Sequence, residues 1–350
     1  MTTHGFGLVG TGIIADTHAK AIKSLPNARL VAVTDVRPDT LHTFAATNNC
    51  EAEPDVPALL ARDDIEVVGV CVPSGLHAEV GIQAAAAGKH LVVEKPIEVT
   101  LAAADNLIKA ADAAGIALTV ISQHRFDPGL IELRRLLDAG ALGNLVLGEA
   151  KTKWYRTQAY YDSAAWRGTR AFDGGALLNQ GVHYVDLLRW CMGPVAEVTA
   201  VCTTSTHQME AEDTALALLR FSSGAVGTIV ASTSVYPGFA QQLEITGTNG
   251  TVIIEDGAIV RADFLDVGSY GASQPRDPAA PTASASADPA LTAIASHAAQ
   301  LADLLTAIEQ ARQPSVTAAS ARDALEIICA VYDSSRDARP VVLAQRHQAP

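Results

Sequence analysis

The stretch Gly10-Thr11-Gly12-Ile13-Ile14-Ala15 decides how the first half of this 350-residue chain is interpreted. It follows an apolar run at residues 6–9, and a helical pattern continues over residues 16–24. In a strand–turn–helix unit, the first glycine allows the tight turn, the second lets a pyrophosphate approach the backbone, and the small third residue lets helix and strand pack closely. Helix N–H groups then face the phosphates. The pattern predicts a dinucleotide site with these contacts: Gly10, Gly12, Ile13 and Ile14.

An acidic residue lies where such a site needs one. The next apolar run, at residues 29–34, ends at Asp35, 23 residues after Gly12. A carboxylate there can accept both ribose hydroxyls and would repel a 2′-phosphate, so it predicts NAD as the cofactor. Arg37 lies two residues later and is included in the cofactor set, because it could instead hold that phosphate. NADP is therefore the alternative.

Strands and helices alternate through the rest of the first half. This alternation predicts a doubly wound parallel sheet, an α/β Rossmann domain over residues 1–123. Ligands bind such sheets beyond the carboxyl ends of the strands. For His77, a role in starting a helix is the alternative to cofactor binding. The predicted strands are residues 67–72, 89–93 and 116–121, and the helices between them are residues 78–87 and 101–114. The residues at strand ends that we assign to the cofactor are Pro73, Ser74, His77, Glu94, Lys95 and Gln123.

The pattern changes after Asp127-Pro128. An amphipathic helix at residues 130–137 precedes long alternating segments that are separated by turn signals. We expect an α+β domain over residues 124–350, with a large, mostly antiparallel open sheet. Its last helices, at residues 291–311 and 318–334, are candidates for packing back on the first domain, and the Ala-, Ser- and Pro-rich residues 271–289 are expected to form an exposed loop. The predicted strands are residues 145–154, 195–204, 214–221, 225–234, 242–247 and 251–255.

Composition excludes several classes of function. A formal net charge of -13 argues against nucleic acid and against an anionic membrane surface. No apolar run is as long as the ~18 residues of a membrane helix, and no basic leader precedes the first strand. Five widely spaced cysteines indicate reduced thiols in a cytoplasmic protein. No set of His, Cys and Asp residues has ligand spacing, so we expect no metal.

The segment from Asp173 to Trp190 is expected to carry the chemistry. Asn179, His183 and Asp186 are spaced by four and three residues, which places their side chains along one helix face. A histidine with an intrinsic pKa near ~6.5 suits proton exchange at neutral pH. Upstream, residues 154–169 interleave aromatic and polar side chains, as a sugar site does. Tyr160 and Trp166 are assigned to the substrate, with a core-packing role as the alternative.

With the glycine-rich turn, Glu94-Lys95-Pro96 and Gly174-Gly175…Asn179-Gln180-Gly181-Val182-His183-Tyr184-Val185-Asp186 in order, the chain resembles the Gfo/Idh/MocA oxidoreductases. The resemblance implies that Lys95 lies beside the nicotinamide and the substrate hydroxyl, that His183 is the acid/base, and that the open sheet makes a homodimer or homotetramer. Inositol dehydrogenase-like members have Asp at the position of Asn179. The pattern from Tyr160 to Thr169 looks more like the branch with nucleotide-sugar 3-dehydrogenases.

The sequence therefore predicts an NAD-dependent dehydrogenase that oxidises a ring hydroxyl of a sugar, a sugar derivative or a cyclitol. Lys95 would polarise the forming carbonyl, and His183 would exchange the proton. Asn179 and Arg125 are assigned to the substrate and Arg167 to the cofactor. Either arginine could hold a substrate hydroxyl, a substrate carboxylate or the nicotinamide amide, with surface ion pairing as the alternative for both. The resemblance leaves two other functions open, an NAD-dependent glycosidase with transient ring oxidation and a non-catalytic dinucleotide sensor.

Overall fold

The computed structural model describes residues 3–265, 268–269 and 294–343. The chain divides into two compact units. The first unit contains residues 1–123 and 292–322, and the second contains residues 124–291 and 323–350. The loop expected at residues 271–289 lies outside the described residues. Among the described residues, no helix is long and apolar enough to cross a membrane.

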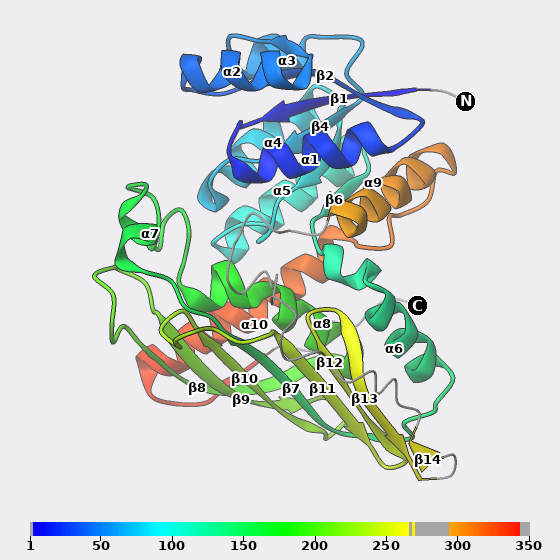
Figure 1. Ribbon diagram of the computed structural model, residues 1–350, viewed down its shortest axis with the longest axis vertical. Coiled ribbons are helices and arrows are strands. Elements are labelled where there is room, and N and C mark those ends of the chain that lie inside the picture. The colour runs from blue at the N-terminus through cyan, green and yellow to red at the C-terminus, as the bar shows by residue number, and fades with distance from the viewer. Residues whose placement is uncertain (1–2, 266–267, 270–293, 344–350) are drawn as a thin grey trace. The chain divides into compact units, whose positions relative to one another are not determined.

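The first unit is built on a parallel sheet of six described strands in the order β3-β2-β1-β4-β5-β6. Helices α1 and α9 pack against each other, as do α4 and α5 (Figure 1). This topology confirms the predicted Rossmann sheet. Its strands are β1 (His4–Val9), β2 (Ala28–Thr34), β3 (Glu51–Ala52), β4 (Val67–Val70), β5 (His90–Val93) and β6 (Leu118–Val120). Its helices are α1 (Ile13–Ser24), α2 (Pro38–Asn48), α3 (Val56–Leu60), η1 (Ser74–Leu76), α4 (His77–Ala86), α5 (Leu101–Ala114) and α9 (Ile294–Glu309).

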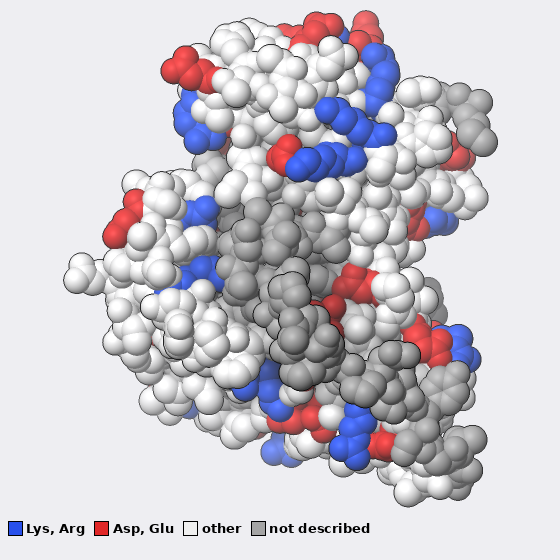
Figure 2. All heavy atoms as spheres, in the orientation of Figure 1, with Lys and Arg blue, Asp and Glu red and all other residues white. Residues whose placement is uncertain are grey.

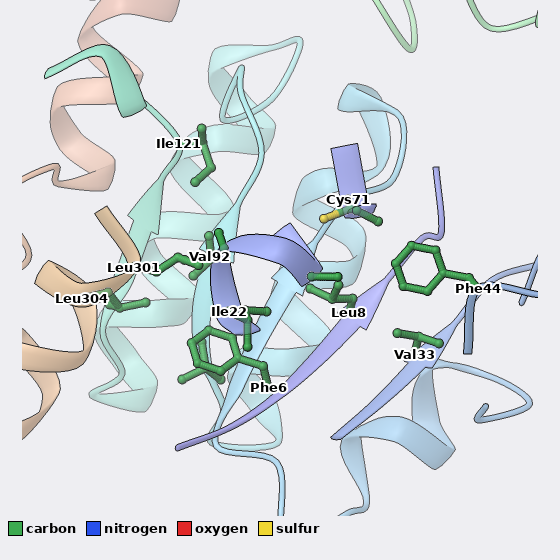
Figure 3. Packing of buried hydrophobic residues seen from close by; sticks show 14 of the residues in the cluster. Phe6, Leu8, Ile22, Val33, Phe44, Cys71, Val92, Ile121, Leu301 and Leu304 are labelled. Carbon is green, nitrogen blue, oxygen red and sulfur yellow. The ribbon is translucent and has the colours of Figure 1, made fainter. Parts of the chain in front are cut away.

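The core of the first unit joins residues from both ends of the chain. Phe6 and Ile22, from β1 and α1, are buried in the same cluster as Leu301 and Leu304 from α9 (Figure 3). Apolar area removed from water contributes about 25 cal/mol per Å². The last part of the chain therefore contributes directly to the stability of the unit that the first residues begin.

The second unit carries a mixed sheet of nine described strands, in which only the β10–β7 pair is parallel. This confirms the expected open, mostly antiparallel sheet. Helices α8 and α10 lie over one of its faces (Figure 1). The order is β14-β13-β12-β11-β7-β10-β9-β8-β15. The strands are β7 (Leu145–Lys153), β8 (Val195–Thr203), β9 (Thr214–Phe221), β10 (Val226–Ser232), β11 (Gln242–Gly247), β12 (Gly250–Glu255), β13 (Ala258–Phe264), β14 (Gly268–Ser269) and β15 (Val341–Val342). The helices are η2 (Gln123–Phe126), α6 (Pro128–Asp138), α7 (Gln158–Asp162), η3 (Ala176–Gly181), α8 (Val182–Met192) and α10 (Ala318–Asp337), of which η2 and α10 begin in the first unit.

The segment expected to be one helix differs in detail. Residues 176–181 form a π-helical turn, η3, and α8 begins only at Val182. Asn179 therefore lies in the π-helical turn, whereas His183 and Asp186 lie on α8. A π-helical turn changes the angular spacing of side chains, so the face predicted from spacings of four and three does not extend through Asn179.

Charged side chains on the molecular surface are mixed in sign. On the face shown in Figure 2, Lys and Arg are interspersed with Asp and Glu. Several form short-range helix pairs, such as Lys20 with Asp16 and Arg134 with Asp138. Such exposed pairs typically contribute below about 1 kcal/mol each, so the fold rests on its cores.

Candidate functional site

The turn between β1 and α1 has the geometry that a pyrophosphate needs. Gly10 has a φ of +95°, and a Cβ added there would lie 2.5 Å from the carbonyl oxygen of Cys71. A Cβ added at Gly12 would meet no atom within 4 Å, so the backbone there faces open space. Gly12 also caps α1 without a side-chain hydrogen bond. The first glycine is required by the fold, and the second leaves room for a ligand at the helix N-terminus.

Asp35 closes the same turn from the end of β2. Its carboxylate accepts hydrogen bonds from the backbone N–H and the hydroxyl of Thr11, both at 2.8 Å, and it pairs with Arg37. Burial alone would raise its pKa, but the hydrogen bonds from Arg37 and Thr11 bring the pKa to about 2. An ionised carboxylate beside the glycine turn fits a ribose of NAD. Arg37 is bound to that carboxylate through Nε and Nη2.

Glu94 lies beside two histidines from distant parts of the first unit and is hydrogen-bonded to one of them, His18. Its Oε1 lies 2.7 Å from Nε2 of His18, and its Oε2 accepts from the backbone N–H of Lys95. Ligand-type atoms of His18, Glu94 and His297 all lie within 4.8 Å of one another. Burial would raise the pKa of Glu94, but the hydrogen bond with His18 and the nearby positive charges hold it at about 2. Sequence spacing could not reveal this group, because its members come from α1, the end of β5 and α9.

Three other predicted residues at the strand ends, His77, Ser74 and Gln123, are buried. His77 is 1% exposed, and its two ring nitrogens lie 2.8 Å from the carbonyl oxygen of Pro96 and 3.0 Å from that of Val72. Burial lowers its pKa, so the neutral form is favoured. His77 thus supports the turn that carries Lys95. Ser74 is buried in η1, and Pro73 precedes it. Gln123 is buried, and its Oε1 has no hydrogen-bond partner among the described residues.

In the second unit, two glycines and a buried acid position the turn that precedes His183. Gly174 has a φ of +75°, and a Cβ at Gly175 would lie 2.1 Å from Oε2 of Glu212. The carboxyl group of Glu212 accepts from the backbone N–H of Leu177 at 2.9 Å and from the hydroxyl of Tyr332 at 3.0 Å. Gly175 is therefore required by the close approach of Glu212, a partner that could not be found from sequence, whereas Gly174 is required by its positive φ.

His183 lies at the start of α8 beside a second histidine. The rings of His183 and His124 meet edge to face, with centroids 5.0 Å apart. Nδ1 of His124 lies 2.7 Å from a carboxylate oxygen of Asp127. The sequence analysis missed His124 as a neighbour of His183, because residues 124 and 183 are far apart in sequence. The predicted acid/base His183 therefore has, within its own unit, an aromatic neighbour that is itself paired with a carboxylate.

Two other predicted residues, Arg125 and Asn179, are engaged with carboxylates. Arg125 forms a buried ion pair with Asp186. The amide of Asn179 donates to Asp173, whose other oxygen accepts from the backbone N–H of Gly168 at 2.8 Å. Asp186 therefore fixes Arg125, a role that the sequence analysis had not assigned to it. Substrate roles for Asn179 and Arg125 stay predictions.

Two arginines lie over the aromatic side chains of residues 154–169. The Cζ atom of Arg167 lies 4.4 Å from the ring centroid of Tyr160 and 4.6 Å from that of Trp166. The Cζ atom of Arg156 lies 4.9 Å from the ring centroid of Trp154 and 5.4 Å from that of Tyr160. Trp154 is 8% exposed and packs as a core residue. The arrangement combines stacking surfaces with N–H donors.

Comparison with known proteins identifies the architecture. Residues 4–122 match the model of an oxidoreductase family with an NAD-binding Rossmann fold, GFO_IDH_MocA, and residues 130–253 match the GFO/IDH/MocA C-terminal domain. The chain is 29% identical to the myo-inositol 2-dehydrogenase of Thermotoga maritima over 71% of its own length and 75% of the relative's. It is 30% identical to the 2,7-anhydro-N-acetylneuraminate hydratase of Mediterraneibacter gnavus over 60% and 55% of the two lengths.

A solved structure is similar over almost the whole chain. The WlbA dehydrogenase of Bordetella pertussis, crystallised with NADH and UDP-GlcNAcA, has a TM-score of 0.87, 31% sequence identity, and coverage of 99% of each chain. The likeness spans both units.

Proposed function

The chain belongs to the GFO/IDH/MocA oxidoreductase family and is an NAD-dependent enzyme that acts on CH–OH groups; within that class, we propose that it oxidises a secondary ring hydroxyl of a sugar, a sugar derivative or a cyclitol. The carrying observation is the glycine turn closed by ionised Asp35 in a family whose relatives act on sugars and cyclitols. The solved relative with UDP-GlcNAcA favours a nucleotide sugar among these substrates.

Lys95 and His183 supply the proton chemistry in this proposal. When bound, NAD accepts the hydride from the carbon that carries the hydroxyl. Nζ of Lys95 donates a hydrogen bond to the hydroxyl oxygen and stabilises negative charge on it. The imidazole of His183 takes the hydroxyl proton. Glu94 and His77 hold the backbone on either side of Lys95 in place. His124 packs against the ring of His183 and fixes its orientation.

Reduced-nicotinamide absorbance tests the proposal directly. The protein is mixed with NAD or NADP and with inositols, free hexoses, simple glycosides, anhydro sugars and nucleotide sugars. We expect absorbance to rise with NAD and one substrate class. Lys95→Ala should abolish the rise while NAD binding persists, and the exposed Lys109→Ala should leave both unchanged. Near-normal turnover by Lys95→Ala would show that the assigned mechanism is wrong.

A second function has its own support. The similarity to a hydratase of an anhydro sugar favours a closed redox cycle, in which transient oxidation of the ring permits elimination and the cofactor is regenerated. Such an enzyme consumes an anhydro sugar or a glycoside without net NADH. Substrate loss, followed by chromatography, with constant absorbance would replace the dehydrogenase proposal by this one.

The second face of the large sheet supports the proposal of a homodimer or homotetramer. The exposed side chains of Val201 and Leu216 are paired across β8 and β9, and Leu218 lies on the same face. Leu218 is 63% exposed. Contiguous apolar side chains on one sheet face are typical of subunit interfaces. We propose that a second copy of the chain covers this face.

A further inference from the structure

We propose that Arg167, together with Arg156, binds an anionic group of the sugar substrate, a carboxylate or a phosphate. The proposal rests on the function proposed above, because it narrows the substrate class of the same enzyme. Both guanidinium groups lie over the ring of Tyr160, and both belong to the second unit.

The orientation of Arg167 suits recognition of a planar anion. Its Cζ atom lies over the rings of both Tyr160 and Trp166, and Nη1 donates to the hydroxyl of Tyr160 at 2.7 Å. Stacking holds the face of a guanidinium and leaves its edge for hydrogen bonds. That edge carries N–H groups in the fork geometry that fits a carboxylate or a phosphate. A preorganised fork loses little conformational entropy when it binds an anion.

Arg167 differs from two other arginines of the second unit in whether a carboxylate neutralises its charge. Arg125 and Arg189 each pair with a carboxylate, that of Asp186 and that of Asp323. Among the described residues, none places a carboxylate within ion-pair distance of Arg167, and its Nε is buried without a hydrogen-bond partner. Burying part of a guanidinium without a counter-charge or a hydrogen-bond partner is costly. An anionic ligand would supply that counter-charge.

Arg156 adds to the positive charge at the same ring. Its side chain is 5% exposed, and burial lowers its pKa from the ordinary range. It stacks on Trp154 as well as on Tyr160. Two guanidinium groups that share one aromatic ring repel each other, and an anion between their edges would relieve that repulsion.

Gln180 gives the cluster a hydrogen-bond acceptor. It is 5% exposed, its Oε1 is buried with no hydrogen-bond partner in the described part of the chain, and its Nε2 lies 3.4 Å from the hydroxyl of Tyr160. A sugar hydroxyl is the donor that such an oxygen would accept from. Gln180 precedes His183 by three residues. Donors for an anion and an acceptor for a hydroxyl together fit an acidic or phosphorylated sugar.

The sequence assigned Arg167 to the cofactor and left a substrate carboxylate open for it; we now assign Arg167 to the substrate. The experiment therefore measures both ligands. Calorimetry with the full chain first determines NADH affinity, and then titrates the NADH-loaded protein with matched probes. Methyl glucoside and methyl glucuronide differ only in a carboxylate at C6, as do UDP-GlcNAc and UDP-GlcNAcA. UDP alone tests for the phosphate.

We expect the wild-type protein to bind methyl glucuronide at least about tenfold more tightly than methyl glucoside if the site takes a carboxylate, or to bind UDP at least about tenfold more tightly than Arg167→Gln does if it takes a phosphate, as one charge-assisted hydrogen bond would give. Arg167→Gln should remove the preference and leave NADH affinity unchanged. Arg167→Lys keeps the charge and should retain part of the preference. The control is Arg170→Gln, an exposed arginine three residues away, which should retain all of it.

The probes separate the two sources of charge. Loss of the glucuronide preference in Arg167→Gln assigns the site to a carboxylate, and loss of UDP binding assigns it to a phosphate; both support the proposal. Equal weakening of methyl glucoside and methyl glucuronide in Arg167→Gln, weaker NADH binding, or a wild-type protein that shows neither a glucuronide preference nor tighter UDP binding than Arg167→Gln would overturn it. An anion preference without any NADH production would refute the dehydrogenase function but not the anion site. Oxidation of an anionic sugar and its neutral match equally well by both wild type and Arg167→Gln would rule out the anion site alone.

Discussion

Glu212→Gln is expected to remove a pH dependence from the stability of the second unit. Burial raises the pKa of Glu212 to about 7, although the N–H of Leu177 and the hydroxyl of Tyr332 donate to its carboxyl group. The charge of Arg170 also acts to lower this pKa, and Cys202 lies near enough to interact with the carboxyl group. The folded protein therefore holds the proton of Glu212 at pH values where the unfolded chain, with an ordinary pKa of 4.5, has lost it.

The magnitude follows from proton linkage. A folded pKa above the unfolded one gives stability that is fully present below pH 4.5 and is lost as the pH rises through 7. The difference between 4.5 and about 7 corresponds to about 3 kcal/mol, at about 1.4 kcal/mol for each pH unit. Glutamine is neutral throughout, so its own constant cost cancels. The unfolding free energy of Glu212→Gln minus that of wild type should therefore rise by about 3 kcal/mol between pH 4.5 and pH 8.

Tryptophan fluorescence isolates the unit concerned. The three tryptophans of the sequence, Trp154, Trp166 and Trp190, all lie in the second unit, so urea transitions followed by their emission report that unit. For a unit of this size, 3 kcal/mol is also a shift of roughly 6–12 °C in Tm. Glu210→Gln, an exposed acid two residues away, is the control and should run parallel to wild type. A flat difference between Glu212→Gln and wild type across this pH range would refute a protonated, buried carboxyl group.

Three further predictions follow from the glycine turn, the ribose site and the sheet face. Gly10→Ala should destabilise the first unit by at least about 1–2 kcal/mol, because the φ of +95° at this position disfavours a residue with a Cβ. Gly12→Ala should leave the Tm unchanged and weaken NAD binding. Equal melting temperatures for the two variants would contradict this. Asp35→Ala should weaken NAD binding about ten- to a hundredfold in fluorescence titrations and reduce the preference for NAD over NADP. An unchanged preference would show that Asp35 does not contact the ribose. Leu218→Asp should lower the mass found by light scattering, while Leu265→Asp, which changes a more exposed leucine just after β13, should not; a monomeric wild type would refute the interface.

Local periodicity was sufficient to predict most of the sheets. The strand at Thr214–Phe221 alternates strictly between buried and exposed positions, and its predicted bounds agree with those observed. The helix at Leu101–Ala114 also agrees, because Thr100 caps it and Gly115 ends it in the left-handed region. The signals for these elements lie within the elements themselves.

Elements that depend on distant contacts were missed. The strand at Ala258–Phe264 buries only one of its seven residues, so its pattern carries little periodicity, and it is held by pairing with β12. The π-helical turn at Ala176–Gly181 depends on Glu212 reaching Gly175, which no local pattern encodes. The buried partners of Glu94 were missed for the same reason, since His18 and His297 meet it only in the folded unit.

The split composition of the first unit has a consequence for biosynthesis. Leu301 and Leu304 of α9 complete a core that Phe6 begins, but about 170 residues separate the two parts of that unit. At ribosomal speeds of about 5–20 residues per second, synthesis of the N-terminal sheet precedes synthesis of α9 by roughly 10–30 s. During that interval the apolar surface meant for α9 is open to chaperones and to neighbouring nascent chains. Slow codons after residue 123 would lengthen this exposure, and a stop codon before residue 292 would leave a product that cannot bury its own core.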